Sequence, residues 1–135
     1  MRGGETVIDY GCGSGILAIA AMKLGAARAD GVDIDGQALL AARHNAIHNQ
    51  VRISFHGAAE AIGQPARIVV ANILAHPLIL LAPLLARLTA PRGRLALAGL
   101  LAAQANDVRV AYGPWFDFEA PEEDEGWMLL SCVRR

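Results

Sequence analysis

Cysteine is scarce in this sequence of 135 residues, and long uninterrupted hydrophobic runs are absent. The two cysteines, Cys12 and Cys132, have neither metal-ligand spacing nor the density of a secreted disulfide scaffold, which favours a reduced, cytoplasmic compartment. The longest apolar stretch, residues 73–86, is interrupted by one histidine and two prolines. It falls short of the roughly 18 uncharged residues of a membrane span, and no signal-peptide layout is expected either.

An excess of charge of either sign is also missing. The formal net charge is -1, which argues against general nucleic-acid binding because such binding needs a basic surface. The hydrophobic content of 54% is sufficient for one core at this length, and no internal repeat or low-complexity linker divides the chain. We therefore expect a single domain over residues 1–135, with neither a membrane nor a nucleic acid as its direct partner.

A glycine-rich loop follows the first expected strand. A β-branched apolar run ends in Asp9, and Gly11, Gly13 and Gly15 follow at alternate positions. The apolar residues 16–24 come next and predict a helix. Glycine lets such a loop turn sharply and approach a ligand, and the free N–H groups of the helix point into the same space. Strand, loop and helix are the first half of a βαβ nucleotide-binding unit.

The glycine spacing indicates which kind of nucleotide to expect. A dinucleotide fingerprint, G-x-G-x-x-G, would need its last glycine at position 16, where this chain has Ile16. The Asp9 carboxylate beside the loop would repel a pyrophosphate but could help hold a cationic ligand, directly or through water. Cys12 has no base nearby in sequence, so we expect it to fill space rather than act as a nucleophile. The alternative is a glycine-rich turn that binds no ligand.

Two acids follow the second expected strand, residues 29–32. Asp33 lies eighteen residues after the last glycine of the loop. That is close to the ~20-residue separation at which an acid of a βαβ unit meets ribose hydroxyls. Ile34 would offer an apolar surface to an adenine ring, whereas Asp35 fits the N-cap of a helix over residues 36–48. An acid that simply ends a strand in solvent is the alternative for Asp33.

The helix over residues 36–48 carries a possible metal-binding pair. His44 and His48 are four residues apart and share one face, but no third ligand is evident, so we expect a solvated face and no metal. The apolar residues of this helix that we expect to face the sheet are Ala38, Leu39, Ala42 and Ile47.

Asn72 closes the fourth expected strand. Residues 51–55 predict the third strand and residues 66–71 the fourth, which should be buried beside the first. Ligands of open α/β sheets gather at the carboxyl ends of the strands. The Asn72 amide can both accept and donate, which suits it to orienting an amine, although a turn-forming asparagine is the alternative.

The last third of the chain predicts a bent helix and a closing hairpin. A helix should begin at residues 76–77 and bend at Pro83, because a proline inside a helix removes one backbone bond. The further expected elements are a turn at 91–93, a strand at 94–98, a helix at 100–112, and strands at 115–119 and 127–133. The last two strands read as an antiparallel hairpin joined by the acidic link 122–126. We expect these acids to keep the hairpin solvated; attraction of a basic protein is the alternative.

Together these features resemble the class I S-adenosylmethionine (SAM) methyltransferases. Five β/α units with a closing hairpin imply an α/β, Rossmann-like fold with a mostly parallel seven-stranded sheet and an antiparallel C-terminal hairpin. The pattern D-x-G-x-G-x-G, the ribose-type acid and the asparagine after the fourth strand carry this resemblance. Segments 8–20, 31–35 and 70–75 resemble, more narrowly, the catalytic domain of ribosomal protein L-eleven methyltransferases.

That resemblance implies a function and a set of site residues. Members of the family use SAM and no metal to methylate lysine ε-amines and the N-terminal α-amine of a large-subunit ribosomal protein. Gly11 and Asp33 match positions that contact SAM, and Asn72 matches the residue between SAM and the incoming amine. Asn72 is the expected catalytic residue, and the expected cofactor-binding residues are Asp9, Gly11, Gly13, Asp33, Ile34 and Asn72.

The chain departs from the family pattern in two places. Family members have an N-terminal recruiting domain and a lead segment with a G-T-G-x-H-type motif whose threonine contacts SAM. This chain has neither, so it looks like a catalytic domain alone or a truncated gene product. Gly36 replaces a usual proline and should loosen the start of its helix. Many class I methyltransferases hold the adenine amino group with an acid or amide after the third strand, where only Glu60 is available and backbone groups are the alternative.

Two other functions stay open. The chain could be a SAM-binding module that is inactive in isolation. A nicotinamide-dependent reductase is the third possibility, although the missing glycine and the terminal hairpin argue against it. The sequence leaves the oligomeric state open.

Overall fold

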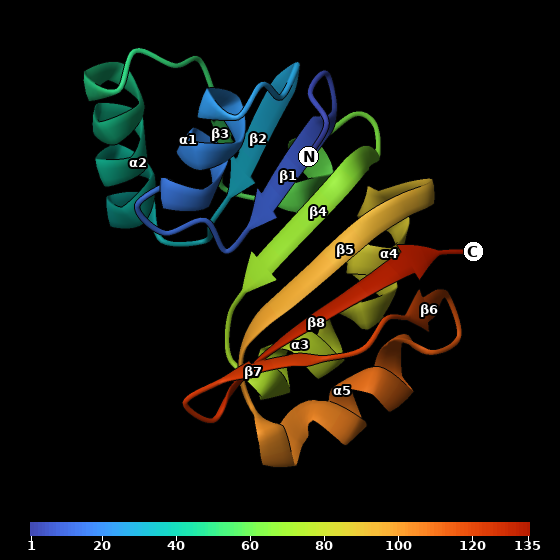
Figure 1. Ribbon diagram of the computed structural model, residues 1–135. Coiled ribbons are helices and arrows are strands. Elements are labelled where there is room, and N and C mark those ends of the chain that lie inside the picture. The colour runs from blue at the N-terminus through green and yellow to red at the C-terminus, as the bar shows by residue number, and fades with distance from the viewer. The chain divides into compact units, whose positions relative to one another are not determined.

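The computed structural model describes residues 1–135, which form two compact units, Met1–Ala66 and Arg67–Arg135 (Figure 1). Each unit carries several strands of β-sheet with α-helices packed on them. None of the helices combines the length and apolar character that crossing a membrane requires. The single domain expected from the sequence stays a prediction.

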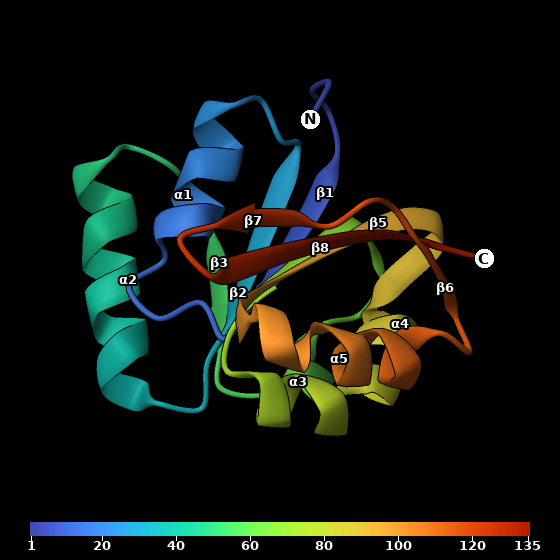
Figure 2. The same cartoon turned by 60° about the horizontal axis from the view of Figure 1, so that its bottom comes forward.

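The first unit is a parallel three-stranded arrangement. Its strands are ordered β3-β2-β1, with bounds β1 (Thr6–Tyr10), β2 (Arg28–Val32) and β3 (Ser54–His56). Helices α1 (Ile16–Lys23) and α2 (Gly36–His48) connect the strands and lie side by side against them in both views (Figures 1 and 2). A short 3₁₀ helix, Ala59–Ala61, follows β3.

Helix α2 has the predicted bounds. Asp35 is its N-cap, as predicted, because its carboxylate accepts a hydrogen bond from the Gln37 N–H at 2.9 Å. The prediction that Ile47 faces the sheet is wrong: Ile47 is 77% exposed, and Ala46 is buried in its place. The buried stripe runs through Leu39, Ala42 and Ala46 at helical spacing, and Ile47 lies one residue off it.

Strand β3 is shorter than predicted. It begins at Ser54 rather than at residue 51, because the preceding residues complete the end of α2. Gln50 adopts a left-handed φ of 59°, and the N–H of Val51 donates to the Ala46 carbonyl at 3.1 Å. This is the hydrogen-bond pattern of a Schellman helix end, which takes Val51 out of the strand.

In the second unit, strand β8 runs antiparallel to the strands on both sides of it. The strand order is β4-β5-β8-β6, with β7 also paired to β8. β8 is antiparallel to β5, β6 and β7. The bounds are β4 (Ala66–Asn72), β5 (Thr89–Leu101), β6 (Phe116–Phe118), β7 (Glu122–Asp124) and β8 (Trp127–Arg134).

Three helices cover one face of this second group of strands. They are α3 (Ala75–Leu80), α4 (Ala82–Leu88) and α5 (Ala105–Tyr112), and Figure 2 shows them together beneath β5 and β8. The Tyr112 hydroxyl donates to the Leu78 carbonyl at 2.7 Å inside this layer. The predicted bend at Pro83 is confirmed as a break at Leu81 between α3 and α4, with the proline in the first turn of α4.

The C-terminal elements differ from prediction in length and number. β5 extends from Thr89 to Leu101 and includes the predicted turn, where Arg92 has a φ of 63°. The helix predicted from residue 100 therefore begins only at Ala105, after a 3₁₀ turn over Ala102–Gln104. The acidic link is itself strand β7, closed by a two-residue turn with positive φ, so the chain forms eight strands in total where we predicted seven.

Candidate active site

The glycine loop of the first unit has the backbone conformation that requires glycine. Gly11, Gly13 and Gly15 have φ values of 73°, 54° and 84°, all in the left-handed region. A Cβ on Gly15 would lie 3.2 Å from the Cβ of Ala42, so this position also permits close packing on α2. A Cβ on Gly13 would meet nothing within 4 Å. The loop is therefore packed at one end and borders open space at the other, which suits it to admit a ligand.

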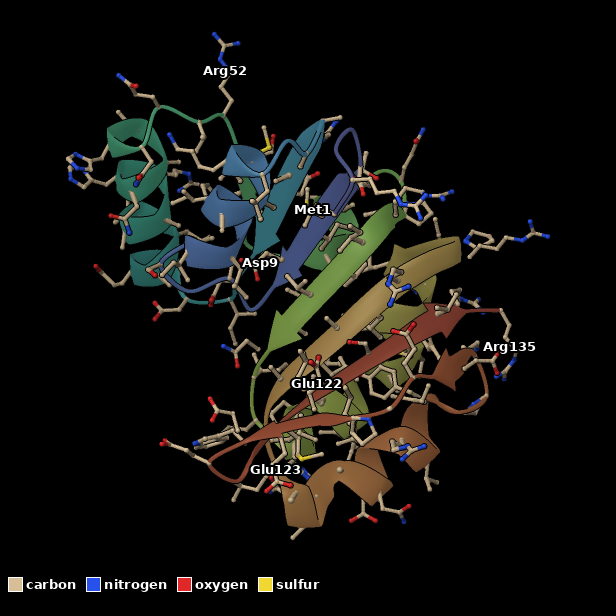
Figure 3. All side chains as sticks on the ribbon, viewed as in Figure 1. Met1, Asp9, Arg52, Glu122, Glu123 and Arg135 are labelled. Carbon is tan, nitrogen blue, oxygen red and sulfur yellow. The ribbon has the colours of Figure 1, made fainter.

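Asp9 anchors the helix that follows this loop. Its carboxylate is only 2% exposed and accepts a hydrogen bond from the Ala18 N–H, in the first turn of α1, at 3.1 Å. Burial raises the pKa of Asp9 to about 6, the Ala18 hydrogen bond opposes that rise, and the Asp33 charge adds to it. Figure 3 labels Asp9 on β1 beside α1. The structure thus gives Asp9 a partner within the protein, and its contact with a ligand stays a prediction.

Asp33 ties the end of β2 to the glycine loop. One carboxylate oxygen accepts from the Gly13 N–H at 2.9 Å, and the other accepts from the Asp35 N–H at 2.9 Å. An ionised carboxylate has about four lone-pair sites, so Asp33 can still accept hydrogen bonds from two ribose hydroxyls. Ile34, the next residue, is 92% exposed and leaves an apolar surface free. These residues fit the nucleoside part of SAM.

Tyr10 directly precedes the glycine loop at the end of β1 and was not singled out from the sequence. Its pKa is raised by partial burial first, and then by the negative charges of Glu60 and Asp33. Those two carboxylates therefore act electrostatically on one phenol at the end of β1. Glu60 lies in the 3₁₀ helix after β3, where the sequence left an adenine contact open. The position of Tyr10 directly before Gly11 was the available signal.

Cys12 fills space within the loop, as predicted. Its side chain is buried, and a Cβ on Gly31 would approach its sulfur to 3.0 Å. Burial, followed by the charges of Asp9 and Asp33, raises the pKa of the Cys12 thiol to about 12. The thiol is therefore protonated near neutral pH and is unsuited to nucleophilic attack. His44 and His48 lie exposed on α2, and no group of three or more metal-binding side chains is present.

Asn72 ends β4 in the second unit and borders a pocket of about 530 Å³. The side chain of Asn72 is exposed and makes no hydrogen bond within the protein, so both halves of its amide are free. The residues that line this pocket are Asn72, Ile73, Leu74, Ala98, Gly99, Trp127 and Met128.

Gly99 shapes this pocket and was not singled out from the sequence. It has a φ of 88°, and a Cβ there would lie 2.5 Å from the Ile73 carbonyl oxygen and 3.0 Å from the side-chain oxygen of Asn72. Only glycine permits that approach of β5 to the segment after β4. An isolated glycine inside an apolar strand pattern is the signal that could have identified it.

Solved structures place this architecture in one class. A ribosomal protein L11 methylase from Lactobacillus delbrueckii subsp. bulgaricus superimposes with a TM-score of 0.94 at 32% identity, over 100% of this chain and 72% of that one. An RNA methyltransferase from Salinibacter ruber, solved with S-adenosyl-L-homocysteine, shares the fold at a TM-score of 0.77 and 22% identity, over 96% and 80% of the two chains. The α/β fold with its antiparallel C-terminal strands, the glycine loop and Asp33 define a class I methyltransferase domain, which confirms the predicted fold class.

The family is narrower than the class. The profile described as Ribosomal protein L11 methyltransferase (PrmA) matches residues 1–135, and the chain belongs to this family. The Ribosomal protein L11 methyltransferase of Thiobacillus denitrificans is 56% identical over 135 residues, which are 100% of this chain and 46% of that relative. The chain thus spans about half the length of the curated relatives it matches. The resemblance recognised in the sequence is confirmed.

Proposed function

We propose that the chain is the SAM-binding catalytic domain of a protein N-methyltransferase that methylates amino groups of ribosomal protein L11, its lysine ε-amines and N-terminal α-amine. The family match over residues 1–135 carries this proposal. Because the chain spans 46% of its relative from Thiobacillus denitrificans, the activity, substrate and partner of the whole protein are included in the proposal. A ribosomal-protein substrate would be met in the cytoplasm, where we propose that the domain acts without metal.

The nucleoside end of SAM would be held in the first unit. Asp33 would accept from the ribose hydroxyls while it keeps the loop in place through Gly13, and Ile34 would cover the adenine ring. Gly11 and Gly13 let the backbone approach the ligand, and Asp9 holds the start of α1 beside the loop. When bound, SAM supplies a methyl group on a positively charged sulfur. The two carboxylates of Asp9 and Asp33 give the loop a negative character, which suits a cationic ligand better than a pyrophosphate.

Asn72 would orient the incoming amine. Its carbonyl oxygen can accept from one amine N–H, which directs the nitrogen lone pair towards the methyl group. Such positioning can lower the activation free energy by about 7–11 kcal/mol. A lysine amine has a reference pKa of about 10.4, so keeping it neutral near pH 7 costs roughly 4–5 kcal/mol. The lowering of the barrier by positioning is larger than this cost. No side chain is assigned as a dedicated base, and water is proposed to take the proton.

The experiment is a methyl-transfer assay with radiolabelled SAM and ribosomal protein L11. It uses a full-length relative such as the Thiobacillus denitrificans protein, with alanine at the position equivalent to Asn72. We expect transfer to fall by two orders of magnitude or more while most of the SAM affinity remains. Full activity of that variant would contradict the role of Asn72. Absence of transfer by the unmodified relative, with SAM binding intact, would support a binding module without activity.

A further inference from the structure

The pocket beside Asn72 has an aromatic wall. Trp127, the first residue of β8, lines the pocket and is 53% exposed although it is one of the largest apolar side chains of the chain. It lies opposite Leu101 of β5, which is 44% exposed. Trp127 and Leu101 therefore form an exposed apolar surface beside the free amide of Asn72, and an aromatic ring next to a polar group is suited to bind a side chain that has both apolar and polar parts.

Strand register shows which side chains share the face of Trp127. In antiparallel pairs, directly opposite residues project from the same face of the sheet. Trp127 lies opposite Asp124, and Leu129 lies opposite Glu122, so these two acids flank the same apolar surface. Glu123 lies opposite Met128 and projects to the other face. Figure 3 shows Glu122 and Glu123 on opposite sides of the β7 ribbon.

An irregularity in β5 lies at the pocket. The pairing of β5 with β8 shifts between Leu97 and Leu100, which is the segment that contains Gly99. Bulges of this kind re-aim side chains and are frequent beside active sites. Here the shift coincides with the close approach of Gly99 to Ile73, the neighbour of Asn72. The irregular segment therefore lies in the same pocket as Asn72 and Trp127.

We propose that Trp127 binds the side chain of the substrate lysine within a basic polypeptide segment. This inference rests on the proposed function and names the part of the chain that recognises its substrate. The methylene stem of lysine would pack on the indole, and its cationic form would be attracted to the ring face before the proton is lost. Asp124 and Glu122 would attract the basic residues that flank the target lysine, because both carboxylates are exposed on the same face.

Trp127 can report this contact directly. The chain has two tryptophans, so the Trp115→Phe variant leaves Trp127 as the only indole. We would add a lysine-containing basic peptide to this variant in the presence of S-adenosylhomocysteine. We expect saturable quenching of the emission, and a clearly weaker response to a peptide in which glycine replaces the target lysine. Equal responses to both peptides would overturn the proposal that a lysine occupies the pocket.

Affinity for the same peptide, labelled with fluorescein, is measured by anisotropy. Trp127→Ala should weaken binding about tenfold, and Trp127→Phe should recover most of it, because an aromatic face remains. Val110→Ala is the matched control: Val110 is exposed on α5 and does not line the pocket. Asp124→Asn should weaken binding and flatten its salt dependence, whereas Asp107→Asn on α5 should not.

The outcomes separate this inference from the proposed function. S-adenosylhomocysteine affinity should stay within about twofold in every variant. If Trp127→Ala binds the peptide as tightly as Val110→Ala does, the role of Trp127 is refuted while SAM binding stands. If the unmodified chain binds no S-adenosylhomocysteine, the proposed function itself fails. If Trp127→Ala does not fold, the comparison of Trp127→Phe with the unmodified chain and the emission of Trp127 decide the question.

Discussion

The carboxylate of Asp33 accepts a hydrogen bond from the backbone N–H of Gly13 at 2.9 Å, which ties the end of β2 to the loop that follows β1. One side chain thereby fixes the glycine loop and keeps acceptor capacity for a ligand. A substitution at Asp33 should affect both, whereas an exposed acid elsewhere should affect neither.

We expect Asp33→Ala to weaken SAM binding by about 1.5–3 kcal/mol, or roughly 10–150-fold, because it removes hydrogen bonds to a charged group. Isothermal titration calorimetry of the 135-residue chain measures this change directly. Asp107→Ala, an exposed acid of α5, is the control and should bind SAM as the unmodified chain does. A dissociation constant that is unchanged in Asp33→Ala would show that this acid does not hold the ribose.

Asp9 should make stability depend on pH. Its pKa is about 6 in the folded chain because of burial, against about 3.9 when unfolded, so the folded state binds the proton more tightly. The stabilisation that Asp9 contributes to the folded state is therefore greatest below pH 4. It is lost as the pH rises through about 6, and the stability no longer depends on this group at higher pH. The whole change is about 3 kcal/mol at most.

Asp9→Asn tests this dependence, because the amide oxygen can still accept from Ala18 and carries no charge. We expect the free energy of unfolding of the variant, relative to the unmodified chain, to increase between pH 4 and pH 6. Urea unfolding at four pH values from 4 to 7, followed by tryptophan fluorescence, measures it. The free energy of unfolding of the Asp107→Asn variant should change with pH as that of the unmodified chain does. If the free energy of unfolding of Asp9→Asn also changes with pH as that of the unmodified chain does, the pKa of Asp9 is not raised by folding.

Gly99→Ala should destabilise the second unit more than Gly126→Ala does. The two glycines have similar φ values, 88° and 85°, so both substitutions carry a similar backbone cost of about 1 kcal/mol. A Cβ at Gly99 would also lie 2.5 Å from the Ile73 oxygen, whereas one at Gly126 would meet nothing within 4 Å. We expect the difference in unfolding free energy to be about 1–3 kcal/mol. Equal losses in the two variants would mean that the pocket segment moves aside easily.

Local patterns in the sequence were sufficient to predict most elements and the first half of the candidate site. The loop glycines, the N-cap at Asp35 and the bounds of α2 follow from backbone preferences that act within a few residues. The break near Pro83 follows for the same reason, because a proline is disfavoured inside a continuous helix but fits the first turn of a new one.

Features that depend on contacts distant in sequence could not be predicted. The acidic segment Glu122–Asp124 has poor strand propensity and is a strand only because β8 supplies its hydrogen-bond partners. The length of β5 depends on the same strand, and the role of Asp9 became visible only once Ala18 lay beside it. Gly99 gave a recognisable signal, but its meaning depends on the carbonyl of Ile73, which lies 26 residues earlier in the chain.

The most direct test of the whole account is equilibrium binding of two competing ligands to the 135-residue chain by calorimetry. We expect SAM or S-adenosylhomocysteine to bind with a measurable, saturable heat. NADH should give none, because its pyrophosphate would meet the negative charge of Asp9 and Asp33. The loop also has Ile16 where the dinucleotide fingerprint needs its last glycine. Tighter binding of NADH than of SAM would contradict the assignment of this chain as a SAM-dependent methyltransferase domain.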